Sequence, residues 1–232
     1  MYSKNYSFKY SDLDNTGNIK LSTIMDLLQD VSIFHSASVG YTLSKMKEIS
    51  VAMLLRGWRV KFFEPVSFDS PAEVKTGIVK SQRCDVIRKY EIIQNNKCKA
   101  IASAHWFSFD FSKERIVRIP EEITNAYDSV AEEDNDLPIL NLRPASDTIL
   151  AGETTITKKY LDTNNHVNNV KSIEIALDYL PDNFSVSDLS VIYQKEMYLN
   201  DKIYIYTQST ESKLSIELRN QNEEPCVLLQ IL

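Results

Sequence analysis

The stretch LDTNNHVNNVKSIEIALD, residues 161–178, joins a polar turn to an apolar helical pattern. Its first half holds Asp162, Asn164 and His166 at alternate positions, and His166 is one of only three histidines in the chain of 232 residues. Runs of aspartate and asparagine favour turns over helices or strands. The second half is apolar at helical spacing until a proline ends the pattern. The stretch therefore predicts a turn that delivers a histidine to the start of a helix.

The same pattern occurs earlier in the chain. A shift of 148 residues places LDNTGNIKLSTIMDLLQD, residues 13–30, on this stretch. Asp14 then falls on Asp162, and Asn18 falls on His166. Similarity at a fixed offset indicates an internal repeat. We therefore expect two copies of one structural unit.

A second shift of 131 residues extends the repeat beyond the helix. It places VKFFEPVSFDSPAEVKT, residues 60–76, on VIYQKEMYLNDKIYIYT, residues 191–207, so that Pro65 falls on Glu196. The second copy thus has a histidine and a carboxylate where the first has an amide and a proline. A pair that served only the fold would be expected in both copies. We interpret the difference as one active half and one structural half.

The fold class follows from the runs around the two helical patterns. We expect helices at about 22–39, with Ser22 as N-cap, and from Val170 to Leu180. Runs rich in β-branched and aromatic residues predict strands at 51–55, 58–63, 72–79, 85–94, 100–111, 153–160, 189–197, 202–209, 213–220 and 226–232. Residues 121–148 lose this periodicity and predict a linker. The order of elements predicts an α+β fold in which each copy packs a helix on an antiparallel sheet.

The polar turn offers the groups that hydrolyse an ester or thioester. In an extended backbone, alternate side chains point to one side. The helix that follows would present unpaired backbone N–H groups to an oxyanion. A carboxylate or imidazole would take a proton from water while those donors hold the charge on the carbonyl oxygen. An Asx-rich turn in which the histidine is only a hydrogen-bonded turn residue explains the same motif, and the two interpretations stay open at this point.

Other chemistries have less support. Asp162 and His166 lack a third obvious metal ligand, so no metal or other cofactor is expected. His35 is expected to be a core histidine and His105 a packing residue of a strand. No GxSxG-type elbow is present, and no cysteine lies near His166 in the sequence.

Composition and charge limit the classes of protein to which the chain can belong. No apolar run approaches the length of a membrane span, no signal or transit peptide is visible, and three widely spaced cysteines favour reduced thiols in a cytoplasmic protein.

Residues 1–120 hold 18 Lys+Arg and 12 Asp+Glu, a net of +6, and residues 121–232 hold 8 and 20, a net of −12. Such asymmetry is typical of a face that meets an acidic partner, or of a solvated surface. The overall net charge of −6 argues against nucleic acid.

The segment YLDTNNHVNNVKSIEIALDYLP, followed by YQKEM, resembles the bacterial and plant acyl-acyl-carrier-protein (acyl-ACP) thioesterases. That family has a D-x-N-x-H-V-N-N box and, about thirty residues later, a glutamate after an aromatic and a basic residue. Three segments of the N-terminal half also resemble the family, namely STIMDLLQDVSIFHSASVGY, RGWRVKFFEPVSFDSPAEVKTG and AIASAHWFSFDFSKERIVRIPEEI. The similarity covers nearly the whole chain.

The resemblance implies two tandem hotdog domains, each a long helix wrapped by an antiparallel sheet. Residues 1–120 would form the acyl-chain-binding domain, 121–148 the linker and 149–232 the catalytic domain. The family's catalytic residues fall on Asp162, Asn164, His166 and Glu196. Met197 replaces a cysteine that many plant members carry after the glutamate, and a thioether cannot act as a thiolate nucleophile. This favours attack by water with Glu196 as base, although the sequence leaves open whether Glu196 or His166 takes the proton.

The resemblance implies a cytoplasmic acyl-ACP thioesterase that ends fatty-acid elongation by releasing the free acid, without a cofactor. Plant members carry a transit peptide, and the absence of one here is typical of a bacterial enzyme. An acyl-CoA thioesterase, a hotdog dehydratase or hydratase and a non-catalytic acyl-binding protein remain alternative functions. As partners, we expect acyl carrier protein and a second copy of the chain in a homodimer. Because acyl carrier proteins are acidic, exposed cations would attract them. The candidates are Arg56, Arg59, Lys61, Arg83, Arg88, Lys89, Lys158, Lys159, Lys171 and Lys195.

Overall fold

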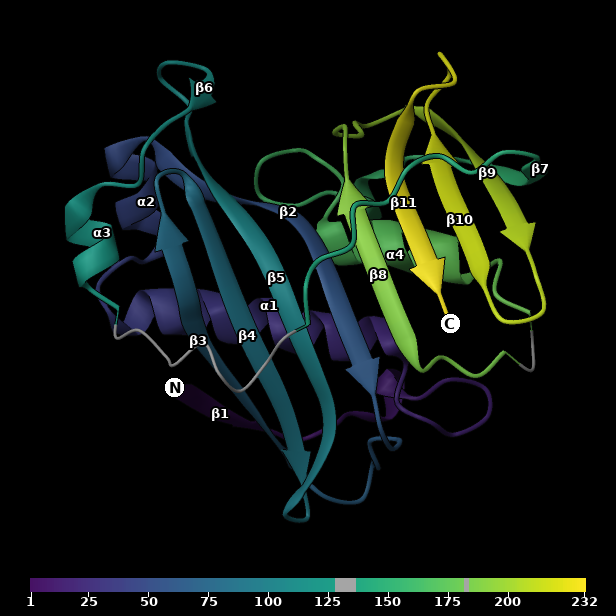
Figure 1. Cartoon of the computed structure of the whole chain (residues 1–232), viewed down its shortest axis with the longest axis horizontal. Coiled ribbons are helices and arrows are strands. Elements are labelled where there is room, and N and C mark those ends of the chain that lie inside the picture. Colours follow the sequence, from purple (N-terminus) through teal and green to yellow (C-terminus); the bar gives the residue numbers. More distant parts are fainter. Residues whose placement is uncertain (128–136, 182–183) are drawn as a thin grey trace. The chain divides into compact units, whose positions relative to one another are not determined.

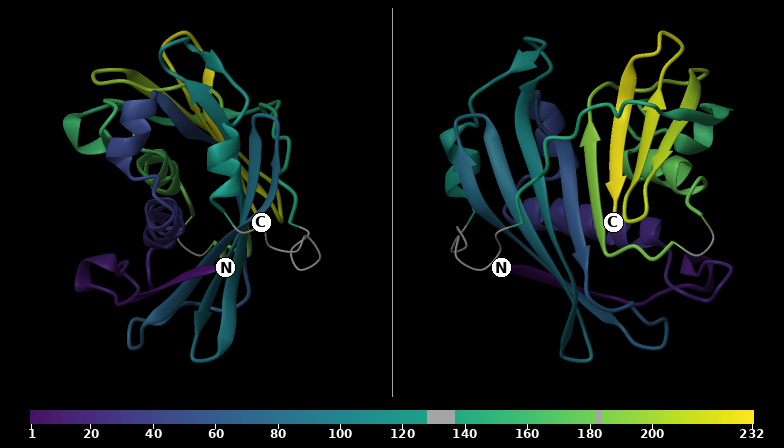
Figure 2. Two further views of the ribbon diagram at one scale, coloured as in Figure 1. Left: turned by 90° about the vertical axis from the view of Figure 1, so that its left-hand side faces the viewer. Right: turned by 45° about the vertical axis from the view of Figure 1, so that its right-hand side comes forward.

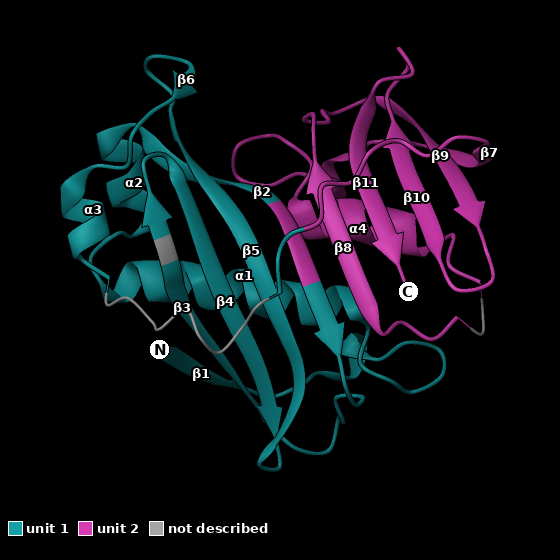
Figure 3. Cartoon of the chain, in the orientation of Figure 1, with its two compact units in different colours: residues 1–56, 60–139 teal, residues 57–59, 140–232 magenta. Residues whose placement is uncertain are grey.

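The computed structural model describes residues 1–127, 137–181 and 184–232 (Figures 1 and 2). The chain divides into two compact units (Figure 3). Unit 1 comprises Met1–Arg56 and Val60–Ile139, and unit 2 comprises Gly57–Arg59 and Leu140–Leu232.

Unit 1 is an antiparallel sheet with a long helix on one face (Figure 1). The strands are paired in the order β1-β3-β4-β5-β2, and β6 pairs with the end of β5. Their bounds are β1 Tyr2–Tyr6, β2 Val51–Phe62, β3 Ala72–Gln82, β4 Asp85–Gln94, β5 Lys97–Asp110 and β6 Arg115–Ile116. The helices are α1 Leu21–Ser38, α2 Leu43–Ile49 and α3 Glu121–Asn125.

Helix α1 packs on this sheet through an apolar stripe. Ile24, Leu28 and Val31 recur at helical spacing and are buried, as is Met25. The helix contacts β1 and β3 (Figure 2). Burial of each large apolar side chain contributes about 1.5–3 kcal/mol. The expected helix with a buried face is thus confirmed.

The start of α1 differs from the prediction. Ser22 lies inside the helix and is buried, and the N-cap is Lys20, whose side chain makes no capping hydrogen bond. Instead the Lys20 N–H donates to the Asp12 carbonyl at 2.8 Å, so a backbone turn leads the chain into the helix. The prediction of Ser22 as N-cap was therefore wrong. Helix α2 was not predicted, although Thr42 caps it by accepting from the Lys45 N–H at 3.2 Å.

Unit 2 repeats the arrangement on a smaller scale. Its strands are paired in the order β8-β11-β10-β9-β7, and helix α4 contacts β10 and β11. The bounds are β7 Ile149–Thr155, α4 Asn169–Leu177, β8 Asp188–Tyr193, β9 Lys202–Ser209, β10 Leu214–Arg219 and β11 Pro225–Ile231. Helix α4 buries Val170, Ile173 and Ala176, so its apolar face follows the same rule as that of α1.

The internal repeat is confirmed in both units. A short 3-10 turn precedes each long helix, at Tyr10–Asp12 in unit 1 and at Lys158–Tyr160 in unit 2. Helices α1 and α4 begin at Leu21 and Asn169, which are 148 residues apart. The two copies of a helix on an antiparallel sheet agree with the α+β fold expected from the sequence.

The segment 121–148, expected to be irregular, begins with helix α3. Residues 128–136 of that segment lie outside the described residues. The boundaries at 120 and 149 remain a prediction.

Candidate active site

The polar turn of unit 2 is closed by its own aspartate. One oxygen of the Asp162 carboxylate, Oδ1, accepts the N–H of Asn164 at 2.7 Å and the N–H of His166 at 3.2 Å. The Asp162 N–H donates to the His166 carbonyl at 2.8 Å. Asn165 adopts a φ of 64°, a left-handed conformation that asparagine tolerates well. The turn is therefore built by local polar groups, and it fixes where the backbone of His166 lies.

The turn of unit 1 is held by the same hydrogen bonds. Asp14 Oδ1 accepts the N–H of Thr16 at 2.8 Å and the N–H of Asn18 at 3.0 Å. The Asp14 N–H donates to the Asn18 carbonyl at 2.8 Å, and Gly17 takes the left-handed position with a φ of 85°. Because both units keep this carboxylate and its bonds, the aspartate is explained by the turn itself.

The two positions at which the sequence repeats differ are occupied in unit 2 by His166 and Glu196, and these side chains lie close together. Nδ1 of His166 lies 3.3 Å from Oε1 of Glu196, and the two side chains are 26% and 49% exposed. The segment that carries Glu196 is joined to the turn by a hydrogen bond from the Val167 N–H to the Met197 carbonyl at 2.9 Å. Residues thirty positions apart thus form a solvent-accessible imidazole–carboxylate pair.

The other two predicted residues do not contact this pair with their side chains. The Asp162 carboxylate is occupied by backbone N–H groups of the turn. The Asn164 side chain is exposed and makes no hydrogen bond within the part of the chain that the structure describes. The structure therefore places all four residues in one neighbourhood of unit 2 but joins only His166 to Glu196.

A third side chain at this pair was missed by sequence reasoning. The Tyr198 hydroxyl donates to Oε2 of Glu196 at 2.5 Å, and its ring packs edge-on against the His166 ring with centroids 5.0 Å apart. The hydrogen bond to Glu196, together with burial, raises the pKa of Tyr198 to about 12. The phenol therefore stays protonated and remains a donor at neutral pH.

The expected oxyanion donors at the start of helix α4 are already occupied. The Asn168 side chain accepts the N–H of Val170 at 2.8 Å and that of Lys171 at 3.3 Å. Asparagine is among the preferred N-cap residues because it satisfies these donors. The expectation that they serve a substrate oxygen was therefore wrong for these two N–H groups.

No reactive sulfur accompanies the pair within the described residues. Met197, next to Glu196, is 3% exposed and points away from solvent. Cys226, whose carbonyl accepts the N–H groups of Gln194 and Lys195, is fully buried, and burial raises the pKa of its thiol to about 11. A thiol that is protonated and inaccessible is a poor nucleophile.

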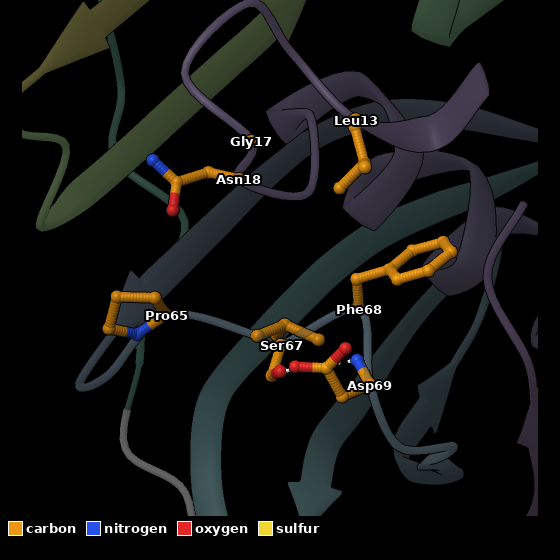
Figure 4. A pocket seen from close by; sticks show the side chains of 8 residues that line it. Leu13, Gly17, Asn18, Pro65, Ser67, Phe68 and Asp69 are labelled. Carbon is orange, nitrogen blue, oxygen red and sulfur yellow. Dashed lines mark hydrogen bonds between the residues drawn. The ribbon is translucent and has the colours of Figure 1, made fainter. Parts of the chain in front are cut away.

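The matching position in unit 1 is a pocket without a histidine or glutamate. Figure 4 shows Asn18 and Pro65 in this pocket, at the positions that the repeat assigns to His166 and Glu196. The amide of Asn18 donates to the Thr16 hydroxyl at 2.9 Å. The remaining lining residues are Leu13, Gly17, Val66, Ser67, Phe68 and Asp69. The two units therefore share the turn but differ in the side chains able to move a proton.

The other two histidines each have a polar partner. His35 is buried, and its Nδ1 lies 2.8 Å from Nη1 of Arg88, which confirms a core histidine. His105 is more than a packing residue, because its Nε2 lies 2.7 Å from an oxygen of Asp85.

Several of the cations expected to be exposed are not. Arg88 and Lys89 are 5% and 2% exposed, so both were wrong as surface candidates. Adjacent strand residues point to opposite faces, and both faces of β4 are covered at this point. Arg59 pairs with Asp188 at 3.0 Å, with 21% of the arginine side chain exposed. By contrast, Arg56, Lys61 and Arg83 are exposed.

Metal sites and membrane-spanning helices are both absent from the described residues. These residues contain no group of three or more His, Cys, Asp and Glu side chains arranged to hold a metal ion. Within the same part of the chain, no helix is long and apolar enough to cross a membrane. The predicted cytoplasmic location remains a prediction.

Comparison with known proteins finds family matches along the chain. The family model of the acyl-ACP thioesterase N-terminal domain matches residues 1–127, and that of the C-terminal domain matches residues 145–226. A palmitoyl-acyl carrier protein thioesterase of Cuphea hookeriana is 24% identical over an alignment of 197 residues, and the match covers 78% of this chain and 47% of that protein. The chain thus spans about half the length of the curated relatives it matches.

Solved structures share the fold over the full chain. An acyl-ACP thioesterase from Bacteroides thetaiotaomicron has a TM-score of 0.87 and 16% identity, and the match covers 100% of this chain and 96% of that one. A 12:0-ACP thioesterase from Umbellularia californica has a TM-score of 0.85 and 17% identity, covering 99% and 95%. The fold is that of tandem hotdog domains. With both family models matched along its length, the chain belongs to the acyl-ACP thioesterase family.

Proposed function

We propose that this protein hydrolyses the thioester of fatty acyl-ACP and releases the free fatty acid, which ends chain elongation. The observation that carries the proposal is the imidazole–carboxylate pair of His166 and Glu196 in unit 2, 3.3 Å apart and open to solvent. Unit 1 has Asn18 and Pro65 at the corresponding positions. The family fold, combined with an imidazole–carboxylate pair that unit 2 has and unit 1 lacks at this position of the repeat, supports a single catalytic centre in unit 2.

The proposed mechanism uses water as nucleophile. Oε2 of Glu196 accepts the Tyr198 hydroxyl and Oε1 faces Nδ1 of His166, so both carboxylate oxygens are engaged. Nε2 of His166 has no hydrogen-bond partner within the described residues. A carboxylate that orients one imidazole nitrogen leaves the other as the proton acceptor. We therefore assign the general base to His166 and the orienting role to Glu196.

Hydrolysis proceeds through one tetrahedral intermediate. Nε2 of His166 takes a proton from water, and the water oxygen attacks the carbonyl carbon of the thioester. The intermediate carries its negative charge on the former carbonyl oxygen. Its collapse breaks the carbon–sulfur bond, and the leaving thiolate takes the proton from the imidazolium. The products are a fatty acid and the free thiol of the carrier, and His166 returns to its neutral form.

Asp162 and Asn164 complete the proposed site in different ways. Asp162 holds the turn together and thereby fixes the backbone of His166, so its role is to position that histidine. Asn164 lies two residues before His166 with an exposed side-chain amide, which supplies N–H donors of the kind that stabilise an oxyanion. We propose that this amide replaces the backbone donors that Asn168 already occupies.

The substrate carrier is also part of the proposal. The family's substrate is an acyl group on acyl carrier protein, and the resemblance assigns the acyl chain to the N-terminal half. Exposed cations in unit 1, among them Arg56, Lys61 and Arg83, would supply local attraction to an acidic carrier despite the net charge of −6.

The test is hydrolysis of matched acyl-ACP and acyl-CoA series by the purified protein, with free thiol and free acid measured together. We expect both products in equal amounts and a higher kcat/KM for acyl-ACP. His166→Ala, purified in the same way, controls for contaminating hydrolases. A preference for acyl-CoA would make the protein an acyl-CoA thioesterase, and binding of acyl chains without turnover would make it an acyl-binding protein.

A further inference from the structure

The tyrosine next to the catalytic pair is held in place from both sides. The Tyr198 N–H donates to Oδ2 of Asp201 at 2.8 Å, and the Asp201 N–H donates back to the Tyr198 carbonyl at 3.1 Å. A β-bridge joins Tyr198 to His166. The backbone of Tyr198 is thus tied both to the next turn and to the histidine-bearing turn.

This backbone geometry sets the direction of three consecutive side chains. Side chains alternate in extended backbone, so Glu196 and Tyr198 share one side while Met197 takes the other. Met197 is buried and Tyr198 is 47% exposed, in agreement with that alternation. Glu196 and Tyr198 are therefore presented together toward His166.

The contacts of Tyr198 connect it to both members of the pair. Its hydroxyl lies 2.5 Å from Oε2 of Glu196, and its ring packs edge-on on the His166 ring at 84°. A half-exposed carboxylate rotates readily about its side-chain bonds unless a partner fixes it. The charge-assisted bond from the phenol supplies such a partner and leaves Oε1 turned toward the imidazole.

We infer that Tyr198 is a positioning residue of the catalytic centre, which holds the Glu196 carboxylate in the orientation that aligns His166. The kinetic consequence of this inference rests on the proposed function. The orientation of Glu196 and His166, by contrast, is a property of the folded protein and can be measured without activity. The corresponding position in unit 1 is Ser67, whose hydroxyl accepts the Asp69 N–H at 3.2 Å within its own loop. The positioning contact is thus specific to unit 2.

The chain offers a matched control for a hydroxyl deletion. The Tyr206 hydroxyl donates to the Glu223 carboxylate at 3.0 and 3.1 Å, also on an exposed part of unit 2 and away from His166. Tyr198→Phe and Tyr206→Phe each remove one phenol–glutamate hydrogen bond and keep the ring. Only the first should affect the catalytic pair.

The kinetic arm measures kcat and KM on acyl-ACP. We expect Tyr198→Phe to lower kcat about tenfold, the equivalent of one hydrogen bond to a charged group, with KM within about twofold. Tyr206→Phe should leave both parameters unchanged. In a Glu196→Ala background, Tyr198→Phe should cause no further loss, because the carboxylate it positions is absent. A full additional loss in that background would overturn the inference.

The second arm does not depend on activity. The chain has three histidines, so the imidazole C–H resonances are few enough to assign by NMR with His→Ala variants. We expect Tyr198→Phe to move the His166 resonance and Tyr206→Phe to leave it in place. An unmoved His166 resonance in Tyr198→Phe would overturn the role of Tyr198. A wild-type protein that hydrolyses no thioester would overturn the proposed function instead, so the two failures are distinguishable.

Discussion

The turns at 14–18 and 162–166 have the same backbone and different chemistry. In each turn an aspartate oxygen accepts two N–H groups, and a left-handed residue stands at the fourth position. Only the second turn ends in a histidine that faces a glutamate. The comparison shows that the aspartate belongs to the architecture of the repeat, whereas the histidine and its carboxylate were placed on that architecture in one unit.

The comparison also separates residues that a sequence motif groups together. Asp162 and His166 stand in one short box, yet only the side chain of Asp162 has a counterpart in unit 1 that makes the same hydrogen bonds. A residue that is needed for the turn in both units need not take part in bond breaking. We therefore expect substitutions in this box to differ in kind, some acting on stability and others on turnover.

Replacement of Glu196 should have a large effect and should identify the base. We expect Glu196→Ala to lower kcat by about 10²–10³-fold, as loss of a group required for proton transfer does. Glu196→Gln should lose about tenfold, because the amide oxygen still orients His166 without its negative charge. Equal losses for the two variants would assign the proton acceptor to Glu196. The measurement is steady-state hydrolysis of acyl-ACP.

The aspartates give the second test, since they share one structural role. Asp14→Ala and Asp162→Ala should each lower the free energy of unfolding by about 1 kcal/mol, because each leaves turn N–H groups without an acceptor. Asp162→Ala should also lower kcat about tenfold by displacing His166, while Asp14→Ala should leave kcat unchanged. Denaturant unfolding and turnover are measured on both proteins. A loss of turnover in Asp162→Asn as large as that of Glu196→Ala would show that the charge of Asp162 acts in the chemistry.

The charge difference between the halves predicts an effect on the association of the enzyme with acyl-ACP, smaller than the effects of the Glu196 and Asp162 variants on turnover. Reversal of Arg56 and Lys61 to glutamate should lower kcat/KM for acyl-ACP several-fold and leave kcat nearly unchanged, because exposed charges act mainly on encounter rates. Salt should lower kcat/KM for acyl-ACP more steeply than for acyl-CoA. Equal salt slopes for the two substrates would contradict recognition of the carrier by these cations.

Thiol modification should have the smallest effect. The Cys226 thiol is buried with a pKa of about 11, and burial also raises the pKa of the Cys98 thiol. Thiols are reactive only as thiolates, so at pH 8 a raised pKa keeps both largely protonated. Alkylation at that pH should reach exposed Cys98 first and leave turnover within about twofold of the untreated protein. An acyl group trapped on any of the three cysteines would contradict attack by water.

Much of this arrangement could be predicted from local patterns. The helical spacing of apolar residues located both long helices, and the repeat in the sequence was enough to match Asn18 with His166. The comparison of the two copies singled out His166 and Glu196, and the family resemblance assigned both to one catalytic site, because periodicity alone cannot bring together residues thirty positions apart.

The remaining features depend on tertiary contacts that leave no local signal. Tyr198 lies in an extended segment, and the bridge to His166 together with the hydrogen bonds to Asp201 determines which way its side chain points. Arg88 and Lys89 are polar in sequence but lie on a strand covered on both faces. Asn168 competes for the N–H groups that an oxyanion would use, and its capping role is visible only once the start of α4 is known.

The most direct test of the asymmetry between the units compares His166→Ala with Asn18→Ala. The two residues end equivalent turns, so each variant removes one side chain at the same place in the repeat. We predict that His166→Ala lowers kcat on acyl-ACP by about 10³-fold while Asn18→Ala stays within about threefold of the wild type. Circular dichroism and thermal unfolding should show both variants folded. Equal losses of turnover in two folded variants would contradict a single catalytic unit.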